Sequence, residues 1–250
     1  MARRFTDLQS KVSICTPTKN RQKFIPILAE CIKNQSYPKH LLEWVIVDDS
    51  LNPIKEIIDS LNLDITVKYH YSSSELTIGH KRNLCHKLSS GDIIINMDDD
   101  DFYPVERISH AVKALSATDC LIAGCSLLPI LYVEEKSLWM SGPFGENHAI
   151  ANTFAFKRQL LEVTSYNDGD SYAEEKYFLK DYQIKLQQLD PFQTIICIAH
   201  SKNTIDKYAL REQAYGLSPL ASPYKQLRNL SGEQRGIIEE IGLIYGKAME

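Results

Sequence analysis

The feature that most constrains the fold is an alternation of short apolar runs with helix-like segments over the first 115 residues. The apolar runs predict buried strands at 11–18, 41–50, 65–71 and 92–97. Segments with helical spacing or helix-end residues follow them, at 24–35, 53–61, 77–91 and 104–115. Gly91 is predicted to close the third of these helices, and Pro104 to lie in the first turn of the fourth. Because the connections are short, the pattern predicts an α/β, Rossmann-like fold with a mostly parallel sheet and helices on both faces.

The alternation weakens after about residue 118, which predicts a smaller, mixed sheet in the second half. The expected elements there are two strands around Pro129, a strand leading into a helix at 151–161, a short helix at 172–182 and a buried strand ending at His200. We therefore predict one domain over 1–215, in which a nucleotide-binding half (11–115) precedes an acceptor-side half (116–215), followed by a helical extension at 216–250.

The tail of the chain predicts one further helix. Ser231 and Gln234 have capping-box spacing. One apolar face of this helix is expected to carry Ile237, Ile238, Ile241, Ile244 and Tyr245. Such a face packs either on the body of the protein or on a partner, so an oligomer formed through this helix stays open.

Composition excludes several classes of protein. A net charge of -4 and a pI near 6.0 argue against a nucleic-acid binder. No apolar run approaches the ~20 residues of a membrane span, and the basic N-terminus has no apolar signal region. The six cysteines form no CxxC pair and mostly lie in apolar runs, which favours buried thiols in a reducing compartment such as the cytoplasm.

An acidic run, Asp98 to Asp101, follows the fourth predicted strand. Four adjacent carboxylates repel one another, so open solvent, a shared proton or a bound cation must make them tolerable. Asp48 and Asp49 end the second strand, and the carboxyl ends of parallel strands share one edge of the sheet. Carboxylate oxygens suit Mg²⁺ or Mn²⁺, usually together with substrate phosphates. A cap on the following helix would need only one aspartate, which favours a metal site.

The order of motifs resembles that of the GT-A nucleotide-sugar glycosyltransferases of family 2. The matching pieces are VSICTPTKNR, NQSYP, WVIVDDS, IGHKRN and GDIIINMDDDD, with SYAEEKYFL and IAHSKNT further along. The chain also looks similar to the small GT-A transferases of large DNA viruses that infect algae, the chlorella viruses. The resemblance implies a GT-A fold, a UDP-sugar donor, Mn²⁺ or Mg²⁺, and transfer with inversion to a glycan, glycoprotein or other hydroxyl acceptor. It also implies a location in the host cytoplasm if the protein is viral.

Carried over position by position, the resemblance implies roles for individual residues. The metal ligands would be Asp100, Asp98 and His200. The donor nucleotide would be walled by Thr16, Pro17 and Thr18, and its uracil ring would be bound by Asp49. Arg82 or Lys81 would lie near the pyrophosphate, and the remaining donor contacts would come from Asn20, Asp98 and Asp99. Glu175 would be the general base, with Glu174 in reserve, because the family usually has Glu-Asp at this point. Trp139, Asn152 and Thr153, which lie between these motifs, are candidates for the acceptor site.

Each assignment has a plainer alternative. Asp48 and Asp49 can form a turn at a strand end, and Lys81 an exposed basic turn. The glutamate pair can lie on a solvated helix face, His200 can be structural, and Trp139 can belong to the core.

Other enzyme classes lack their motifs here. There is no Gly-rich phosphate loop, no GxGxxG and no GxxxxGK[ST]. Phe102 follows the acidic run where a haloacid-type phosphatase would have Gly-Thr. A GT-A-like module that binds a nucleotide-sugar or glycan without turnover remains the alternative to an enzyme.

Overall fold

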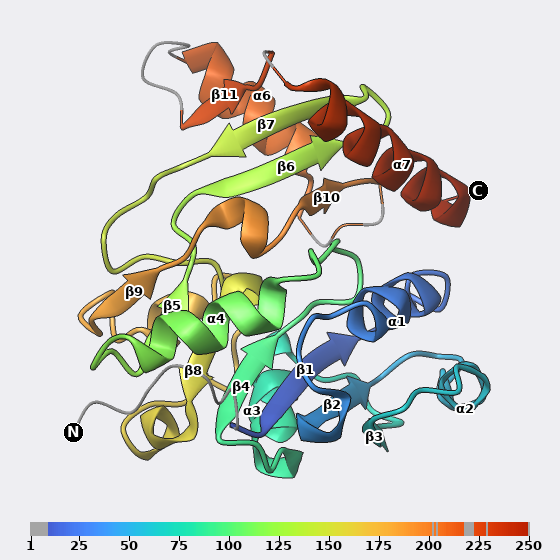
Figure 1. Cartoon of the computed structure of the whole chain (residues 1–250), viewed down its shortest axis with the longest axis vertical. Helices are drawn as coiled ribbons and strands as arrows, with labels where there is room; N and C mark the ends of the chain where they lie inside the picture. Colours follow the sequence, from blue (N-terminus) through green and yellow to red (C-terminus); the bar gives the residue numbers. More distant parts are fainter. Residues whose placement is uncertain (1–9, 202, 204, 218–222, 229, 250) are drawn as a thin grey trace.

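A seven-stranded sheet forms the centre of the molecule (Figure 1). The computed structural model describes residues 10–201, 203, 205–217, 223–228 and 230–249. The strand order is β3-β2-β1-β4-β8-β5-β9. These strands are β1 (Val12–Thr18), β2 (Leu42–Asp48), β3 (Thr66–Tyr71), β4 (Ile93–Asn96), β5 (Ile122–Gly124), β8 (Ala155–Lys157) and β9 (Leu186–Gln188). All pairs are parallel except those that β8 makes with β4 and β5, so the predicted α/β class with a mostly parallel sheet is confirmed.

Helices cover both faces of this sheet. The helices are α1 (Ile25–Lys33), α2 (Lys55–Ser60), α3 (Ile78–Leu88), α4 (Arg107–Ser116), α5 (Glu175–Phe178), α6 (Lys207–Leu217) and α7 (Gly232–Met249). Short 3-10 segments lie at Lys39–Leu41, Ala151–Thr153, Arg158–Glu162 and Pro191–Gln193. Side chains alternate along each strand: Trp44 and Ile46 face the core under α1, α2 and α4, whereas Val45 and Val47 face the core under α3 and α5.

Two predicted helix ends are wrong. The third helix ends at Leu88 with Ser89 as its C-cap, and Gly91 lies beyond it. A glycine is required at position 91 because its backbone packs closely against β1: a Cβ there would lie 2.6 Å from the backbone nitrogen of Ser13. The fourth helix begins at Arg107 rather than around Pro104.

A second, smaller sheet lies beside the first, in the order β10-β6-β7-β11 (Figure 1). Its strands are β6 (Leu128–Tyr132), β7 (Ser137–Ser141), β10 (Cys197–Ala199) and β11 (Tyr224–Gln226). Pro129 lies inside β6 and not between two strands, at a position beyond the register with β10. A bridge between Phe102 and Ile196 joins the acidic segment to the start of β10, and so links the two sheets near the acidic run.

The C-terminal helix packs on the body of the protein. Ile241, Tyr245 and Ala248 are buried in a cluster that also contains Phe24. Ile237 and Ile244 do not share this face, since they are 45% and 40% exposed. The side chain of Gln234 lies outside the described residues, and the boundary at residue 215 stays a prediction. Within the described residues, no helix is both long and apolar enough to cross a membrane.

Candidate active site

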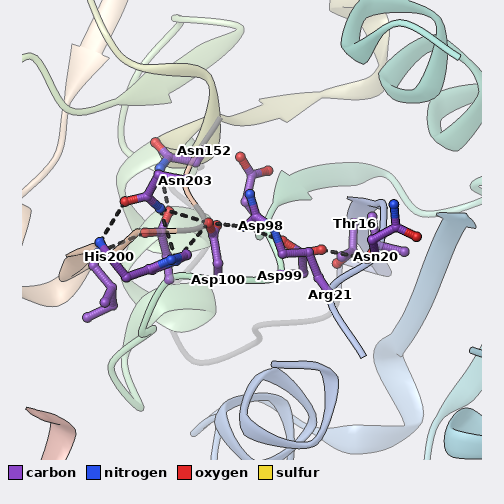
Figure 2. A network of polar contacts seen from close by, with 12 residues as sticks. Thr16, Asn20, Arg21, Asp98, Asp99, Asp100, Asn152, His200 and Asn203 are labelled. Atoms are coloured by element: carbon purple, nitrogen blue, oxygen red, sulfur yellow. Dashed lines mark hydrogen bonds and ion pairs between the residues drawn. The ribbon is translucent and has the colours of Figure 1, made fainter. Parts of the chain in front are cut away.

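The acidic run follows β4 at the edge where β1 and β2 also end, and Figure 2 shows Asp98, Asp99 and Asp100 there among polar side chains from other segments. Asp99 accepts a hydrogen bond of 2.5 Å from the Thr18 hydroxyl. Arg21, in the loop after β1, forms ion pairs with Asp99 and Asp100. Burial, and then the charge of Asp100, raises the pKa of Asp99 to about 8 although Arg21 opposes the shift. The Arg21 guanidinium and the raised pKa of Asp99 therefore both reduce the repulsion within the run. An arginine partner was not among the means expected from the sequence, and the bound cation stays a prediction.

Asp100 is the most heavily contacted carboxylate of the run. Its Oδ2 lies 3.2 Å from His200 Nε2 and accepts a hydrogen bond of 3.0 Å from Asn203 Nδ2. Figure 2 shows His200 and Asn203 on one side of Asp100 and Arg21 on the other. Burial by itself raises the pKa of Asp100, but the His200 hydrogen bond and the charges of Arg21 and Lys207 hold it well below its usual range. Asp100 is therefore an anion at neutral pH.

The predicted metal ligands are only partly brought together. Asp100 and His200 converge, but Asp98 is directed to Arg82. Among the described residues, no group of three or more His, Cys, Asp or Glu side chains is arranged to hold a metal ion. An anionic carboxylate beside an imidazole nitrogen still suits Mn²⁺ or Mg²⁺ when phosphate oxygens supply the other ligands. The donor set at Asp100 and His200 therefore fits a metal that is bound together with a diphosphate.

Arg82 joins the acidic run to the base motif. Its guanidinium donates two hydrogen bonds of 3.0 Å to the carboxylate of Asp98 and one of 2.8 Å to Glu174. The side chain of Arg82 is 3% exposed. Burial by itself lowers its pKa, but the charges of Asp98 and Glu174 hold it well above the usual value. Arg82 was predicted to contact the pyrophosphate; in this structure its donors are used by two carboxylates.

Glu175, next to Glu174, begins the short helix α5. Its side chain is half-buried, and burial followed by the charge of Glu174 raises its pKa. Glu174 is 7% exposed and accepts the hydrogen bond from Arg82, so its carboxylate has a structural partner. The two glutamates thus differ in environment: Arg82 pairs with Glu174, whereas burial and the charge of Glu174 raise the pKa of Glu175 above its usual value.

The residues predicted to wall the nucleotide are mostly internal. Thr16 is fully buried, and its hydroxyl donates to the carbonyl of Met97 while it accepts from the indole of Trp44. Pro17 is also buried within β1. Both residues are buried within the central strand β1, which is covered on both faces, and their contact with a nucleotide stays a prediction. Only Thr18, at the end of β1, reaches the acidic run.

The ends of the first two strands are tied together. Asn20 has a left-handed backbone (φ 55°), and its amide oxygen accepts a hydrogen bond from the backbone nitrogen of Leu51. Asn20 therefore links the loops after β1 and β2. Asp48 accepts hydrogen bonds from the backbone nitrogens of Ser50 and Ile54, which is the turn role expected as its alternative.

Asp49 and Lys81 form a buried ion pair. The Asp49 carboxylate lies 2.8 Å from Lys81 Nζ and accepts another hydrogen bond from the backbone nitrogen of Leu76. The two side chains are 0% and 7% exposed. Neither the base contact predicted for Asp49 nor the phosphate contact predicted for Lys81 is available while this pair is closed. The pair fixes α3 against the end of β2.

The three residues predicted for the acceptor have other partners. Asn152 donates a hydrogen bond of 2.6 Å to Asp101, the last residue of the acidic run. Thr153 is fully buried, and its hydroxyl donates to the carbonyl of Ile150. Trp139 lies in β7, where its ring is 4.8 Å from the guanidinium carbon of Arg211. Burial and cation–aromatic packing therefore explain Thr153 and Trp139, and only Asn152 lies beside the acidic run.

A cavity of about 1030 Å³ lies elsewhere, and a single stretch of chain between residues 161 and 181 lines it. Neither the acidic run nor either candidate base contributes to its lining. Tyr172 and Tyr177 line it and are 72% and 57% exposed. This hollow is therefore distinct from the acidic site.

Two residues at the site have no role in the sequence-based assignment. Arg21 follows the first strand inside the TPTKNR motif, so the only signal was a cation in a strand-end loop. Lys207 begins α6, and its amine donates a hydrogen bond to the carbonyl of Ile198. The charge of this amine also lowers the pKa of the Asp100 carboxyl. Both cations compensate the acidic run through contacts between distant segments, which no local pattern reveals.

Comparisons with known proteins identify the family and the fold of this chain. The glycosyl transferase family 2 model matches residues 13–199. A stretch of 106 residues, 40% of this chain, is 29% identical to poly(ribitol-phosphate) beta-N-acetylglucosaminyltransferase TarS of Staphylococcus aureus strain Mu50, of which it covers 18%. The uncharacterized glycosyltransferase YwdF of Bacillus subtilis strain 168 is 26% identical over 196 residues, 70% of each protein.

Solved structures show the same fold. The mannosyltransferase PcManGT from Pyrobaculum calidifontis, in complex with GDP-Man and Mn²⁺, has a TM-score of 0.63 at 16% identity, covering 96% of this chain and 72% of that one. TarS residues 1–349 in complex with UDP-GlcNAc has a TM-score of 0.58 at 17% identity, covering 93% and 71%. These likenesses establish the GT-A architecture. Since the family match spans most of the chain, this protein belongs to glycosyl transferase family 2.

Proposed function

We propose that this protein is a metal-dependent, inverting glycosyltransferase that moves a sugar from a UDP-sugar to a hydroxyl of a glycan or glycoprotein. The observation that carries this proposal is the Asp98–Arg82–Glu174 contact. It holds the acidic run, where a diphosphate and its cation would bind, next to the segment that carries a carboxylate base. A transfer reaction needs both at one site, whereas a binding module needs only the first.

The leaving diphosphate is assigned to the acidic run. Asp100 and His200 would hold a divalent ion, which supplies charge stabilisation to the leaving group when bound. Arg21 already contacts Asp99 and Asp100, and a guanidinium can also contact phosphate oxygens. Buried donors that are fixed before reaction are worth more than the same groups in water.

Glu175 is assigned as the general base. As the acceptor oxygen attacks the anomeric carbon, its proton passes to a carboxylate oxygen of Glu175. The new C1–O bond forms on the face opposite the diphosphate while the bond from C1 to the diphosphate oxygen breaks, and the nucleoside diphosphate leaves with that electron pair. One such displacement inverts the anomeric centre, and it needs only one base. The raised pKa of Glu175 supports this role. The neighbouring Glu174 accepts a hydrogen bond from Arg82, which leaves Glu175 as the first candidate.

The donor and the setting are proposals as well. The TarS complex contains UDP-GlcNAc and the PcManGT complex contains GDP-Man, so both nucleotides belong in any test. The aligned part is only 18% of TarS, and its polymer acceptor does not transfer to this chain. The chlorella-virus origin, the cytoplasmic location and an oligomer through α7 stay predictions.

Calorimetry and turnover together test the proposal. Wild-type protein is titrated with UDP and with GDP, with and without Mn²⁺, and then assayed for nucleotide released from a panel of UDP- and GDP-sugars. We expect Asp100→Ala to abolish the Mn²⁺-dependent part of UDP binding. Glu175→Gln should keep that binding and lose roughly 10²- to 10⁴-fold in turnover.

Glu56→Gln, on the exposed face of α2, is the matched control and should behave as wild type. Normal turnover by Glu175→Gln would shift the base to Glu174. Tight nucleotide binding without any release of free nucleotide would favour the non-catalytic module.

A further inference from the structure

The C-terminal helix reaches the candidate active site through one aromatic ring. α7 lies beyond residues 13–199, the part matched by the family model. Its buried residues Ile241, Tyr245 and Ala248 pack in one cluster with Phe24 and with strands β6 and β10. In Figure 1 the helix is the dark red segment beside β6, above α1. The helix therefore contacts elements that carry site residues.

Phe24 is the centre of a stack. Its ring centroid lies 4.9 Å from that of His200, with an interplanar angle of 23°. On the side of α7, the Tyr245 ring lies 6.0 Å away, tilted by 31°. The guanidinium carbon of Arg21 is 6.0 Å from the same Phe24 centroid. One buried phenylalanine thus contacts two residues whose polar ends meet at Asp100.

The stack orients the His200 imidazole. Nε2 of His200 faces Asp100 at 3.2 Å, and its backbone nitrogen donates to the amide oxygen of Asn203. The side-chain amide of Asn203 also lies 3.0 Å from His200 Nε2, so polar contacts hold that end of the ring. The face of the imidazole packs on Phe24, which limits how far the ring can tilt. Phe24 can support the imidazole only while its other neighbours, Tyr245 among them, fill the space around its ring, because a void lets neighbouring side chains relax.

We propose that Tyr245 of α7 is a positioning residue of the active site, which holds the His200 imidazole toward Asp100 by buttressing Phe24. Its consequence for metal and nucleotide binding rests on the proposed function, but the orientation of His200 does not.

The ring of Tyr245, and not its hydroxyl, carries this role. Tyr245 is fully buried, and its hydroxyl has no hydrogen-bond partner among the residues that the structure describes. A phenylalanine at this position keeps the contact with Phe24, whereas alanine removes it. Ile241 offers a matched control, because it lies one turn earlier on α7, is 2% exposed and belongs to the same cluster.

The experiment compares Tyr245→Ala, Tyr245→Leu, Tyr245→Phe and Ile241→Ala in the full chain. The first readout is the His200 imidazole resonance, assigned with His200→Gln, in protein without ligand. Loss of the stack should shift this resonance in Tyr245→Ala and Tyr245→Leu, and leave it unmoved in Tyr245→Phe and Ile241→Ala. Tyr245→Leu removes the aromatic ring and leaves a smaller void beside Phe24 than alanine does. It should give a smaller shift in the same direction, and it keeps the test valid if the alanine variant unfolds. An unmoved resonance in Tyr245→Leu, or an equal shift in Ile241→Ala, would overturn the inference.

The second readout is the affinity for UDP with Mn²⁺. We expect Tyr245→Ala to weaken it by up to roughly tenfold, in line with the strength of one aromatic contact. Ile241→Ala should weaken it by less than twofold even if its melting temperature falls as far. If wild type binds no nucleotide with Mn²⁺, the proposed function fails and the resonance still decides the role of Tyr245. If wild type binds and both variants weaken equally, α7 only stabilises the fold.

Discussion

Arg82→Met is the most informative single change, because it separates a structural guanidinium from a phosphate ligand. Methionine keeps most of the length of the side chain and removes its charge. Three hydrogen bonds are lost, two of 3.0 Å to Asp98 and one of 2.8 Å to Glu174. Both carboxylates then stay in place without their cation.

The size of the loss follows from burial. Breaking a buried ion pair by removing one partner costs about 3–5 kcal/mol. Glu174 is 9% exposed at its side chain, but Asp98 is 23% exposed and recovers some hydration. We therefore expect a loss near the lower end, about 3 kcal/mol. For a domain of this size, that lowers the melting temperature by roughly 6–12 °C.

Urea unfolding of the ligand-free protein measures this loss directly. Lys55→Met is the control, because both side chains of the Lys55–Asp59 ion pair are more than half exposed. Its loss should lower the free energy of unfolding by less than about 1 kcal/mol. Adding Asp98→Asn and Glu174→Gln to Arg82→Met should restore part of the stability, because no unpaired charge then remains. An Arg82→Met protein as stable as wild type, but unable to bind UDP, would refute the structural role and restore the phosphate contact.

Two further predictions concern α3 and its neighbours. Burial, followed by the charges of Arg82 and Arg158, lowers the pKa of His86 to about 3. As the pH falls, His86 is therefore protonated in the unfolded chain before it is protonated in the folded protein. The free energy of unfolding decreases below pH 6.5, by about 2 kcal/mol between pH 6.5 and 5. His86→Leu should flatten this slope in urea titrations, and an unchanged slope would assign it to another group. Gly79→Ala places a Cβ 2.0 Å from the backbone oxygen of Asn167 and should cost about 1–3 kcal/mol. Gly236→Ala, with nothing within 4 Å, should be neutral or stabilising; equal melting temperatures for both variants would contradict the steric argument.

Much of the fold was predictable because its signals are local. The apolar runs that end at Thr18, Asp48 and Asn96 predicted the three strands that lead to the site, β1, β2 and β4. A β-branched run bounded by turn residues has few other stable conformations. The order of the acidic and base motifs then indicated the family. Helix ends were less predictable, because Gly91 is required by its approach to Ser13 and not by a helix cap.

The partner of each charged side chain was decided by the tertiary structure. The family resemblance implied that Arg82 or Lys81 lies near the pyrophosphate, but in this structure Arg82 pairs with two carboxylates and Lys81 pairs with Asp49. Residue type limits what a cation can bind, whereas only packing determines which anion lies within reach and how dry the contact is.

By itself, then, the sequence determined the class of fold, the edge of the sheet that carries the site and the carboxylates that gather there, because each depends on local periodicity and chain order. Tertiary structure alone placed Arg21 on Asp100 and Tyr245 behind Phe24. Both contacts join segments that are far apart in the sequence. The first depends on opposite charges brought together in a buried place and the second on burial of apolar surface, and no local pattern encodes either.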